Sequence, residues 1–315
     1  MGGRPDSERL RIRLCGLQLR NPIIAASGSC GYGVELERVL DWSKVGGLVL
    51  KGLSSQPLAG NPPPRLWETP CGMLNSVGLQ NLGVRAFVKE KLPFVRQLPT
   101  IVFANVFGFR VEEYAEVIEV LEEAGGLDGY ELNVSCPNTK QGGMYFSSDP
   151  ALLEQVVAAA RKVTRRPLIV KLSPNVADIQ PLARAAESAG ADAISLINTV
   201  RALAIDARTR SPRLGGGFGG LSGPAIKPIA LRFVYEAALA VRIPVIGIGG
   251  ISNGEDAAEF LIAGASAVEV GTALFWDPTA PVRIARQLDE FLIREGVEHV
   301  SQLVGTLRWP GQGSV

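Results

Sequence analysis

The chain has 315 residues, of which 46% are hydrophobic and 20% are charged, and its formal net charge is +1. This length fits one large α/β barrel or two smaller domains, and the balanced charge, without a block of Lys and Arg, does not support a nucleic-acid-binding surface. No apolar run approaches the roughly 18 residues of a membrane span, and residues 1–9 are too polar for a secretory signal. We therefore expect a cytosolic (cytoplasmic) protein that binds neither nucleic acid nor a membrane.

Residues 9–20 alternate apolar and charged side chains around Cys15-Gly16, a pattern that predicts a short β-hairpin. After the hairpin, short apolar segments typical of buried strands alternate with amphipathic segments typical of helices. Strands are predicted at residues 22–26, 47–51, 100–105, 130–134, 168–172, 193–198, 245–249 and 267–270, and helices include residues 111–124, 152–163, 179–189, 225–241 and 255–263. This alternation predicts a single (β/α)8 TIM barrel over residues 1–315, with a doubly wound open sheet as the alternative.

Two connections, residues 53–82 and residues 199–222, are too long for simple turns. Each follows a predicted strand, so each is expected on the C-terminal face of the barrel, where the active sites of such barrels lie. The second connection contains Gly215-Gly216-Gly217 and Gly219-Gly220. We interpret it as a mobile lid, with a solvated linker as the alternative.

The four cysteines and the single histidine limit the possible chemistry. The cysteines, at positions 15, 30, 71 and 136, form no Cys-x-x-Cys pair, which argues against a zinc or iron–sulfur site in this chain and suits the reducing cytosol. His299 is the only histidine, so neither a His-centred triad nor a His-rich metal site is expected. We expect His299 at the surface or at a helix end, and no metal site.

The residues that follow the predicted strands are mostly amides, hydroxyls and glycines, with two lysines and almost no carboxylates. In chain order they are Ser27, Lys51, Asn105, Asn133 with Cys136, Lys171, Asn198-Thr199, Gly249-Gly250 and Gly271-Thr272. Such a ring suits a planar anionic ligand that needs many hydrogen bonds, whereas a divalent metal would need clustered carboxylates.

Glycines follow the seventh and eighth predicted strands, in Gly249-Gly250 and in Gly271-Thr272. Barrels of this kind hold a phosphate there on backbone N–H groups, and glycine lets the backbone approach the phosphate oxygens closely. Tight turns without a ligand are the alternative. No Gly-x-Gly-x-x-Gly segment opens a βαβ unit, so a mononucleotide fits better than a nicotinamide dinucleotide.

Cys136 and the two lysines each have more than one interpretation. Cys136 lies at the mouth of the fourth strand between Asn133 and Asn138, which suits a catalytic base or nucleophile, although a buried Cys without chemistry is the plainer alternative. Lys51 and Lys171 have apolar flanks and can form a Schiff base or stay protonated to stabilise negative charge on a reduced flavin or a ligand carboxylate. Ordinary salt bridges are the third interpretation.

Several motifs resemble those of dihydroorotate dehydrogenases. They are residues 75–81 (Asn-Ser-Val-Gly-Leu-Gln-Asn), 133–138 (Asn-Val-Ser-Cys-Pro-Asn), 170–175 (Val-Lys-Leu-Ser-Pro-Asn) and 219–228 (Gly-Gly-Leu-Ser-Gly-Pro-Ala-Ile-Lys-Pro), with 247–250 and 270–273. The resemblance extends from the hairpin to about residue 305. A Cys at position 136 resembles the soluble class 1 enzymes, since the membrane-associated class uses Ser and carries an N-terminal extension. Residues 219–228 resemble the NAD-linked subclass, class 1B.

The resemblance implies oxidation of (S)-dihydroorotate to orotate on FMN, a flavoprotein reaction of de novo pyrimidine (UMP) biosynthesis. Cys136 would remove the C5 proton of a substrate held between thiol and flavin, while C6 delivers a hydride to flavin N5. The implied substrate-binding residues are Lys51, Asn75, Ser76, Val77, Gly78, Leu79, Asn133, Asn198 and Thr199. The implied FMN-binding residues are Ser27, Lys51, Gly52, Asn105, Asn133, Lys171, Ile197, Gly223, Gly249, Gly250, Gly271 and Thr272.

The resemblance also implies partners. Class 1B implies a homodimeric core with an electron-transfer subunit, in a heterotetramer; FAD and a [2Fe-2S] centre would reside on that partner, because this chain has neither a cluster motif nor a dinucleotide fingerprint. The alternatives are a fumarate-dependent class 1A enzyme, a Schiff-base aldolase with Lys171 as nucleophile, and a flavin-binding barrel without turnover. Departures from the family pattern, which bear on the rim and the lid, occur at Cys30, Phe107, Phe109, Gln141 and residues 200–203 with Ala202.

Overall fold

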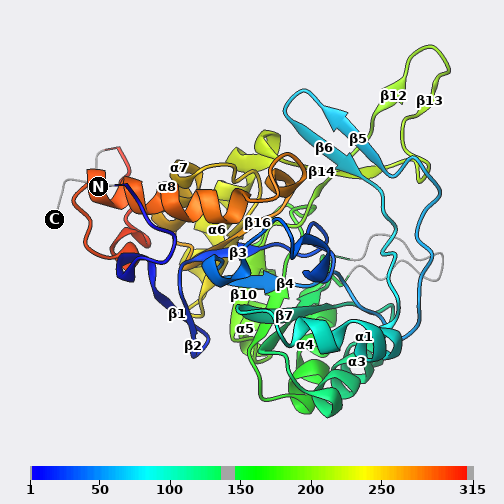
Figure 1. Cartoon of the computed structure of the whole chain (residues 1–315). Coiled ribbons are helices and arrows are strands. Elements are labelled where there is room, and N and C mark those ends of the chain that lie inside the picture. The colour runs from blue at the N-terminus through cyan, green and yellow to red at the C-terminus, as the bar shows by residue number, and fades with distance from the viewer. Residues whose placement is uncertain (1, 136–145, 311–315) are drawn as a thin grey trace.

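Eight parallel strands close into a barrel in the computed structural model, which describes residues 2–135 and 146–310 (Figure 1). Around the barrel the order is β10-β15-β16-β3-β4-β7-β8-β9, so each strand pairs with the next barrel strand along the chain. The closed ring confirms the (β/α)8 prediction and excludes the open sheet. The barrel strands are β3 (Ile23–Ala25), β4 (Gly47–Val49), β7 (Ile101–Val106), β8 (Gly129–Asn133), β9 (Leu168–Lys171), β10 (Ala193–Leu196), β15 (Val245–Ile248) and β16 (Ala267–Val270).

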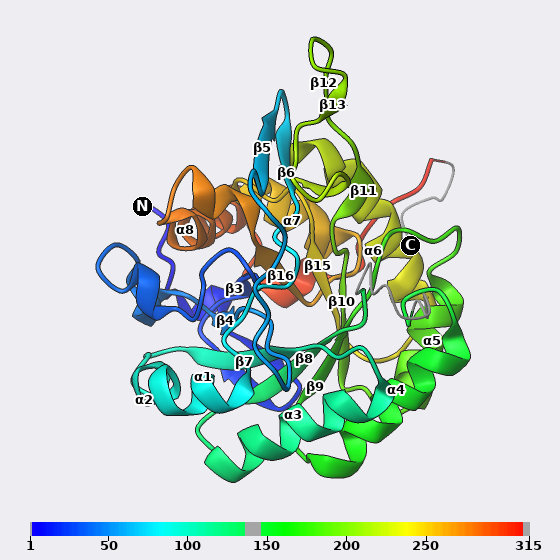
Figure 2. The ribbon, with the colours of Figure 1, turned by 90° about the vertical axis from the view of Figure 1, so that its right-hand side faces the viewer.

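Helices surround the barrel (Figure 2). The five predicted helices are present within a few residues of their expected bounds, as α3 (Val111–Ala124), α4 (Pro150–Val163), α5 (Gln180–Ser188), α6 (Lys227–Ala240) and α7 (Gly254–Ile262). Further helices are α1 (Val84–Glu90), α2 (Leu92–Val95) and α8 (Ala280–Arg294), with 3-10 turns η1 (Glu8–Leu10), η2 (Val34–Leu36), η3 (Trp42–Lys44), η4 (Pro224–Ile226), η5 (Thr272–Phe275) and η6 (Val300–Leu303). No helix within the described residues has the length and apolar character that a membrane span requires.

Local sequence explains where these helices begin. Asp149 caps α4 by accepting hydrogen bonds from the backbone N–H groups of Ala151 and Leu152. Asn253 and Asp256 form a reciprocal capping box at the start of α7. His299, predicted at the surface or at a helix end, caps η6 in the same way.

A separate apolar cluster fills the N-terminal half of the barrel interior. Its members are Leu14, Leu19, Ile24, Val49, Phe103, Ile169, Ala193, Ile246 and Ala267. The predicted hairpin supplies the first two residues, from β1 (Ile12–Leu14) and β2 (Leu17–Leu19), and its turn contacts the end of the barrel, since Cys15 Sγ donates to the carbonyl of Asp192 just before β10. The hairpin therefore closes the N-terminal end of the barrel.

The two long connections fold together into a second, antiparallel sheet beside the barrel (Figures 1 and 2). Residues 53–82 supply β5 (Leu66–Thr69) and β6 (Gly72–Asn75), and residues 199–222 supply β11 (Val200–Ala202), β12 (Ile205–Asp206), β13 (Ser211–Pro212) and β14 (Gly219–Ser222). The sheet order is β11-β14-β6-β5, and β12 pairs with β13 in a projecting hairpin. The segment interpreted as a lid is therefore not an unbroken loop, because backbone pairing of β14 with β11 and β6 orders Gly219 and Gly220 as strand residues.

Candidate active site

Inward-facing polar side chains form a buried layer across the C-terminal half of the barrel. On most of these strands the polar residue lies two positions after a member of the apolar interior cluster, and on β8 it lies at the equivalent position. Alternate residues of a strand share a face, so these polar side chains also point into the barrel. The members of this polar floor are Asn105, Glu131, Lys171, Ser195 and Glu269, each no more than 5% exposed. Burial of so many polar groups is costly unless they are mutually paired, and it marks this end of the barrel as the candidate site.

Lys171 lies at the centre of the polar floor. Its Nζ lies 3.4 Å from Glu131 Oε1 and 3.2 Å from Glu269 Oε2, and it donates to Ser27 Oγ at 3.2 Å. The structure thus brings together the predicted Lys171 and Ser27, which are far apart in sequence.

Glu131 receives a donor on each oxygen. Asn105 Nδ2 donates to Glu131 Oε1 at 2.7 Å, and Ser195 Oγ donates to Glu131 Oε2 at 2.8 Å. The predicted Asn105 therefore connects to Lys171 through Glu131. It also needs Gly52, since a Cβ at position 52 would lie 2.9 Å from Asn105 Oδ1 and 3.0 Å from the Phe107 ring.

The surroundings determine which of these groups is charged. Burial alone would lower the pKa of Lys171, but the carboxyl groups of Glu131 and Glu269 outweigh it and raise that pKa above its ordinary value. Burial raises the pKa of Glu269 well above its ordinary value, and the neighbouring Glu131 adds to the effect. Burial has the same tendency at Glu131, but Lys171 and the hydrogen bonds to that carboxyl hold its pKa below the ordinary value. Lys171 is therefore a stable cation.

Glu131, Ser195 and Glu269 were not among the residues predicted from sequence. The expectation of almost no carboxylates describes the rim but is wrong for the layer beneath it. A signal was available, because Glu131 and Glu269 are single acidic residues within apolar strands, and Glu131 has the same strand parity as Asn133. Among residues 2–135 and 146–310, no group of three or more His, Cys, Asp and Glu side chains is arranged to hold a metal ion.

Amide side chains meet above the floor at the ends of β8 and β10. Asn198 Nδ2 donates to Asn133 Oδ1 at 3.3 Å, and Asn133 Oδ1 also accepts from the backbone N–H of Ser135 at 3.2 Å. Asn198 Oδ1 accepts from the backbone N–H of Thr199 at 2.7 Å. Asn133, Asn198 and Thr199 are partly exposed, so they retain donors and acceptors for a ligand.

The second sheet adds Asn75 to the site. Asn75 ends β6, pairs in register with Gly220 of β14, and donates from Nδ2 to the Gly220 carbonyl at 3.2 Å. Gly220 is required there, because a Cβ at that position would collide with the Thr199 side chain. The substrate residues predicted on separate connections, Asn75 and Thr199, are therefore both packed against one glycine.

The predicted segment after Asn75 is fixed mainly by Asn61. Asn61 Nδ2 donates to Ser76 Oγ at 2.9 Å, and the backbone N–H of Asn61 donates to the Val77 carbonyl at 3.1 Å. Gly78 and Leu79 follow with positive φ angles of 73° and 58°. This turn contains the remaining predicted substrate residues.

Lys51 follows β4 and is half-buried at the rim. Burial lowers the pKa of Lys51, the nearby Glu35 opposes this, and Arg65 reinforces it. Glu35 is itself paired with Lys91 at 3.8 Å. A half-buried ammonium group near a second cation suits an anionic ligand.

Glycine-rich turns follow β15 and β16. Gly249 and Gly250 have φ angles of 129° and 78°, and a Cβ at Gly250 would lie 2.9 Å from the Gly223 carbonyl oxygen. The backbone N–H groups of Gly250, Gly271 and Thr272 donate to no other described residue. Thr272 begins η5, so the free donors of Gly271 and Thr272 lie at the start of a short helix, the arrangement that binds phosphate in such barrels. Ile197 is buried close to Gly249 at the same end of the barrel.

Some residues singled out in the sequence lie outside the described residues or have a packing role. Cys136 and Gln141 lie outside the described residues. Cys30 is buried, and burial raises the pKa of its thiol to about 12, so it is a packing residue. Phe107 is buried and meets Phe109 edge-to-face at 6.1 Å between ring centroids.

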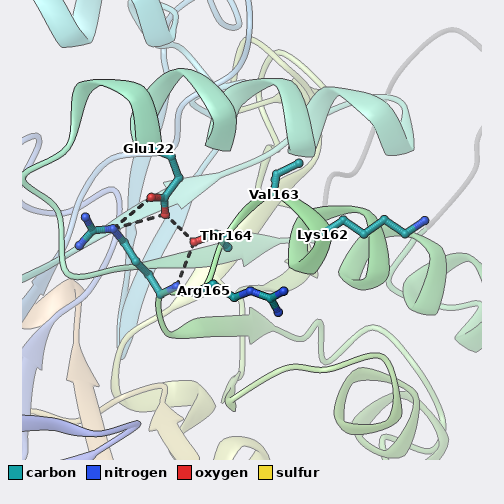
Figure 3. Close-up of a pocket in the computed structure, with 6 residues that line it drawn as sticks. Glu122, Lys162, Val163, Thr164 and Arg165 are labelled. Carbon is teal, nitrogen blue, oxygen red and sulfur yellow. Dashed lines mark hydrogen bonds and ion pairs between the residues drawn. The ribbon is translucent and has the colours of Figure 1, made fainter.

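A surface hollow of about 460 Å³ lies away from this site (Figure 3). It is lined by Glu122, Lys162, Val163, Thr164, Arg165 and Arg166, which precede β8 or β9 and so belong to the N-terminal end of the barrel. Three of its polar groups are paired with one another, since Thr164 Oγ1 donates to Glu122 Oε1 at 2.5 Å and Arg166 Nε pairs with Glu122 at 3.3 Å. It is an ion-paired surface and not the active site.

The sequence matches the family model for dihydroorotate dehydrogenase over residues 9–292. It is 67% identical over 301 residues to a protein of Solibacter usitatus named dihydroorotate dehydrogenase A (fumarate), a match that covers 96% of this chain and 99% of the relative. It is 53% and 51% identical over 304 residues to proteins of Pelobacter propionicus and Citrifermentans bemidjiense, both named dihydroorotate dehydrogenase B (NAD(+)), catalytic subunit, again over 96% of this chain and 99% of each relative. The chain therefore belongs to the dihydroorotate dehydrogenase family.

Proposed function

We propose that this chain oxidises (S)-dihydroorotate to orotate with FMN bound at the C-terminal end of the barrel, as a cytoplasmic step of de novo pyrimidine biosynthesis. Membership of the family supports the proposal. The observation that carries it is a buried cation, Lys171, beneath a rim whose backbone N–H groups at Gly250, Gly271 and Thr272 have no partner among the described residues. A phosphate-bearing ring that gains negative charge on reduction needs both features at one face.

The described residues fit FMN. The free N–H groups of Gly250, Gly271 and Thr272 would hold its phosphate, and Lys171 with Ser27 would lie at the flavin ring. When bound, FMN would supply the hydride acceptor. The other proposed FMN residues are Lys51, Gly52, Asn105, Asn133, Ile197, Gly223 and Gly249.

The amide cluster fits dihydroorotate, which carries a carboxylate and ring amide groups. Asn75, Asn133, Asn198 and Thr199 would orient these groups, with Lys51 close to the negative charge and residues 76–79 shaping the wall. Cys136, three residues beyond Asn133, is the proposed base that takes the C5 proton. Its position in the sequence, directly after β8, supports that role.

The names of the relatives differ in the electron acceptor that they give. The Solibacter relative is named for fumarate, whereas the other two are named catalytic subunits for NAD(+). We favour the second type, with a homodimeric core and an electron-transfer subunit that carries FAD and [2Fe-2S], because residues 219–228 resemble that subclass. The fumarate-dependent type is the alternative.

A Schiff-base aldolase is less well supported. Such a lysine must lose its proton near neutral pH, whereas the carboxyl groups around Lys171 raise its pKa. No observation on the described residues favours this second function.

Parallel steady-state assays of the purified chain with NAD, fumarate and an artificial dye test the proposal and the acceptor together. We expect dihydroorotate oxidation with the dye, little with NAD alone, and NAD reduction once the electron-transfer subunit is added. Rapid fumarate turnover would assign the fumarate-dependent type. An absence of turnover with every acceptor would contradict the proposed reaction.

A further inference from the structure

Two carboxyl groups beneath the flavin site have no role in the chemistry described so far. Glu131 and Glu269 are 0% and 1% exposed, and they approach the same ammonium group, Lys171 Nζ, at 3.4 Å and 3.2 Å. Two acidic groups and one basic group therefore share a space closed to water.

The hydrogen bonds differ between the two carboxyl groups. Both Glu131 oxygens accept from neutral donors, Asn105 and Ser195. Glu269 Oε2 lies against Lys171, but Glu269 Oε1 has no donor among the described residues. Burial of an ionised oxygen that has no donor is costly, and protonation of Glu269 would remove its charge.

No further charge within the described residues balances a second carboxylate. The inward positions on the neighbouring strands β7, β10 and β15 are neutral, Asn105, Ser195 and Ile248, and the neutral Ser27 follows β3. Lys51, after β4, lies at the rim and makes no ion pair with either glutamate. Two ionised glutamates would leave one uncompensated buried negative charge, and one retained proton removes it.

We propose that Glu131 and Glu269 share one proton and form with Lys171 a neutral buried triad that sets the charge beneath the flavin site. The flavin part of this inference rests on the proposed function. Glu131 and Glu269 are positioning residues, since they act through Lys171. The raised pKa of Glu269 and the lowered pKa of Glu131 have the directions that a shared proton requires, with the proton mainly on Glu269.

Glutamine is a neutral mimic of a protonated glutamate, which makes the proposal testable without flavin. The infrared spectrum of the purified protein at neutral pH should contain a carboxylic-acid carbonyl band. Glu269→Gln should remove it, and Glu131→Gln should also remove it, because Glu269 then ionises against Lys171. The control is Asp256→Asn, since Asp256 is a buried carboxylate paired with Lys227 at 2.7 Å and with a lowered pKa, and its loss should leave the band unchanged. A wild type without the band, or a band that survives in both glutamine variants, would overturn the shared proton.

The flavin-loaded protein gives a second readout, the reduction potential. Each single glutamine variant keeps the triad neutral, so the ratio of reduced to oxidised flavin at a fixed potential should change less than about 3-fold. The double variant leaves Lys171 unbalanced and should favour reduced flavin by about tenfold or more. Tenfold effects of both single variants would mean two ionised glutamates and would overturn the proposal. If neither the wild type nor any variant binds flavin, the proposed function is wrong. The infrared result still tests the shared proton in that case.

Discussion

Replacing Lys171 with methionine keeps the length of the side chain but removes its charge, and we expect a loss of about 3–5 kcal/mol in the free energy of unfolding at neutral pH. Lys171 is 5% exposed, and its ammonium group lies 3.2–3.4 Å from two carboxyl oxygens. At an effective dielectric constant of about 20, one such charge pair is worth about 5 kcal/mol. The variant leaves the Glu131 carboxylate buried with hydrogen bonds alone.

The loss in Lys171→Met should shrink as the pH falls. In the wild type the depressed pKa of Glu131 contributes stability above the ordinary carboxyl range, and this contribution is lost as the pH falls through the folded-state pKa. Without Lys171, burial dominates and raises the pKa of Glu131. Mild acid then protonates the unpaired carboxylate, so the deficit at about pH 5 should be smaller than at about pH 7.

Urea unfolding of both proteins without flavin, at the two pH values, measures this effect. Lys227→Met is the matched control. Lys227 Nζ lies 2.7 Å from Asp256 and 2.8 Å from Glu259, but its side chain is 25% exposed, and Asp256 keeps its hydrogen bonds from Ser252 and Asn253, so the removal of Lys227 should cost about 1 kcal/mol. A Lys171→Met loss no larger than that of the control, or one independent of pH, would refute the account of the polar floor.

Three further outcomes are expected. Cys136→Ser should slow flavin reduction by dihydroorotate by orders of magnitude while FMN stays bound, because a hydroxyl is a poorer base than a thiol; near-wild-type bleaching in rapid mixing would exclude Cys136 as the base. Gly250→Ala should weaken FMN binding about tenfold or more, because of backbone strain at φ 78° and contact with Gly223. The control Gly296→Ala, at φ 67° with open space around it, should leave FMN binding unchanged. Equal affinities of the two variants in a fluorescence titration would argue against the proposed phosphate-binding role of Gly250. At about pH 8 a thiol reagent should modify the exposed Cys71 well before Cys30, whose pKa is raised to about 12, and similar rates would contradict the burial of Cys30.

The barrel is predictable from the sequence because its signal is local. Short apolar strands alternate with amphipathic helices, and helix starts such as Asp149-Pro150 and Asn253 carry their own capping residues. The second sheet is not predictable in this way. Its pairing joins Asn75 to Gly220 across 145 positions, and the register depends on how both connections pack over the barrel.

The candidate site also has a part that is predictable from the sequence and a part that is not. Lys171, Asn133 and Gly250 are predictable because they stand where strands end, and strand ends of one barrel meet at one face. Glu131 and Glu269 lie one layer deeper in the barrel. Each is the single acidic residue of a segment that is otherwise mostly apolar, so the segment is predicted as a buried strand without a functional residue. The state of their protons depends on Lys171 from a third strand, so only the assembled barrel reveals it.

Anaerobic mixing of the purified, flavin-loaded chain with dihydroorotate tests the central claim most directly. The account predicts that the yellow absorbance of oxidised flavin bleaches and that orotate forms in an amount equal to the flavin reduced. A yellow protein that keeps its absorbance would contradict the proposed reaction. A colourless protein trapped by borohydride with a carbonyl substrate would contradict both the reaction and the assignment of Lys171 as a stable cation.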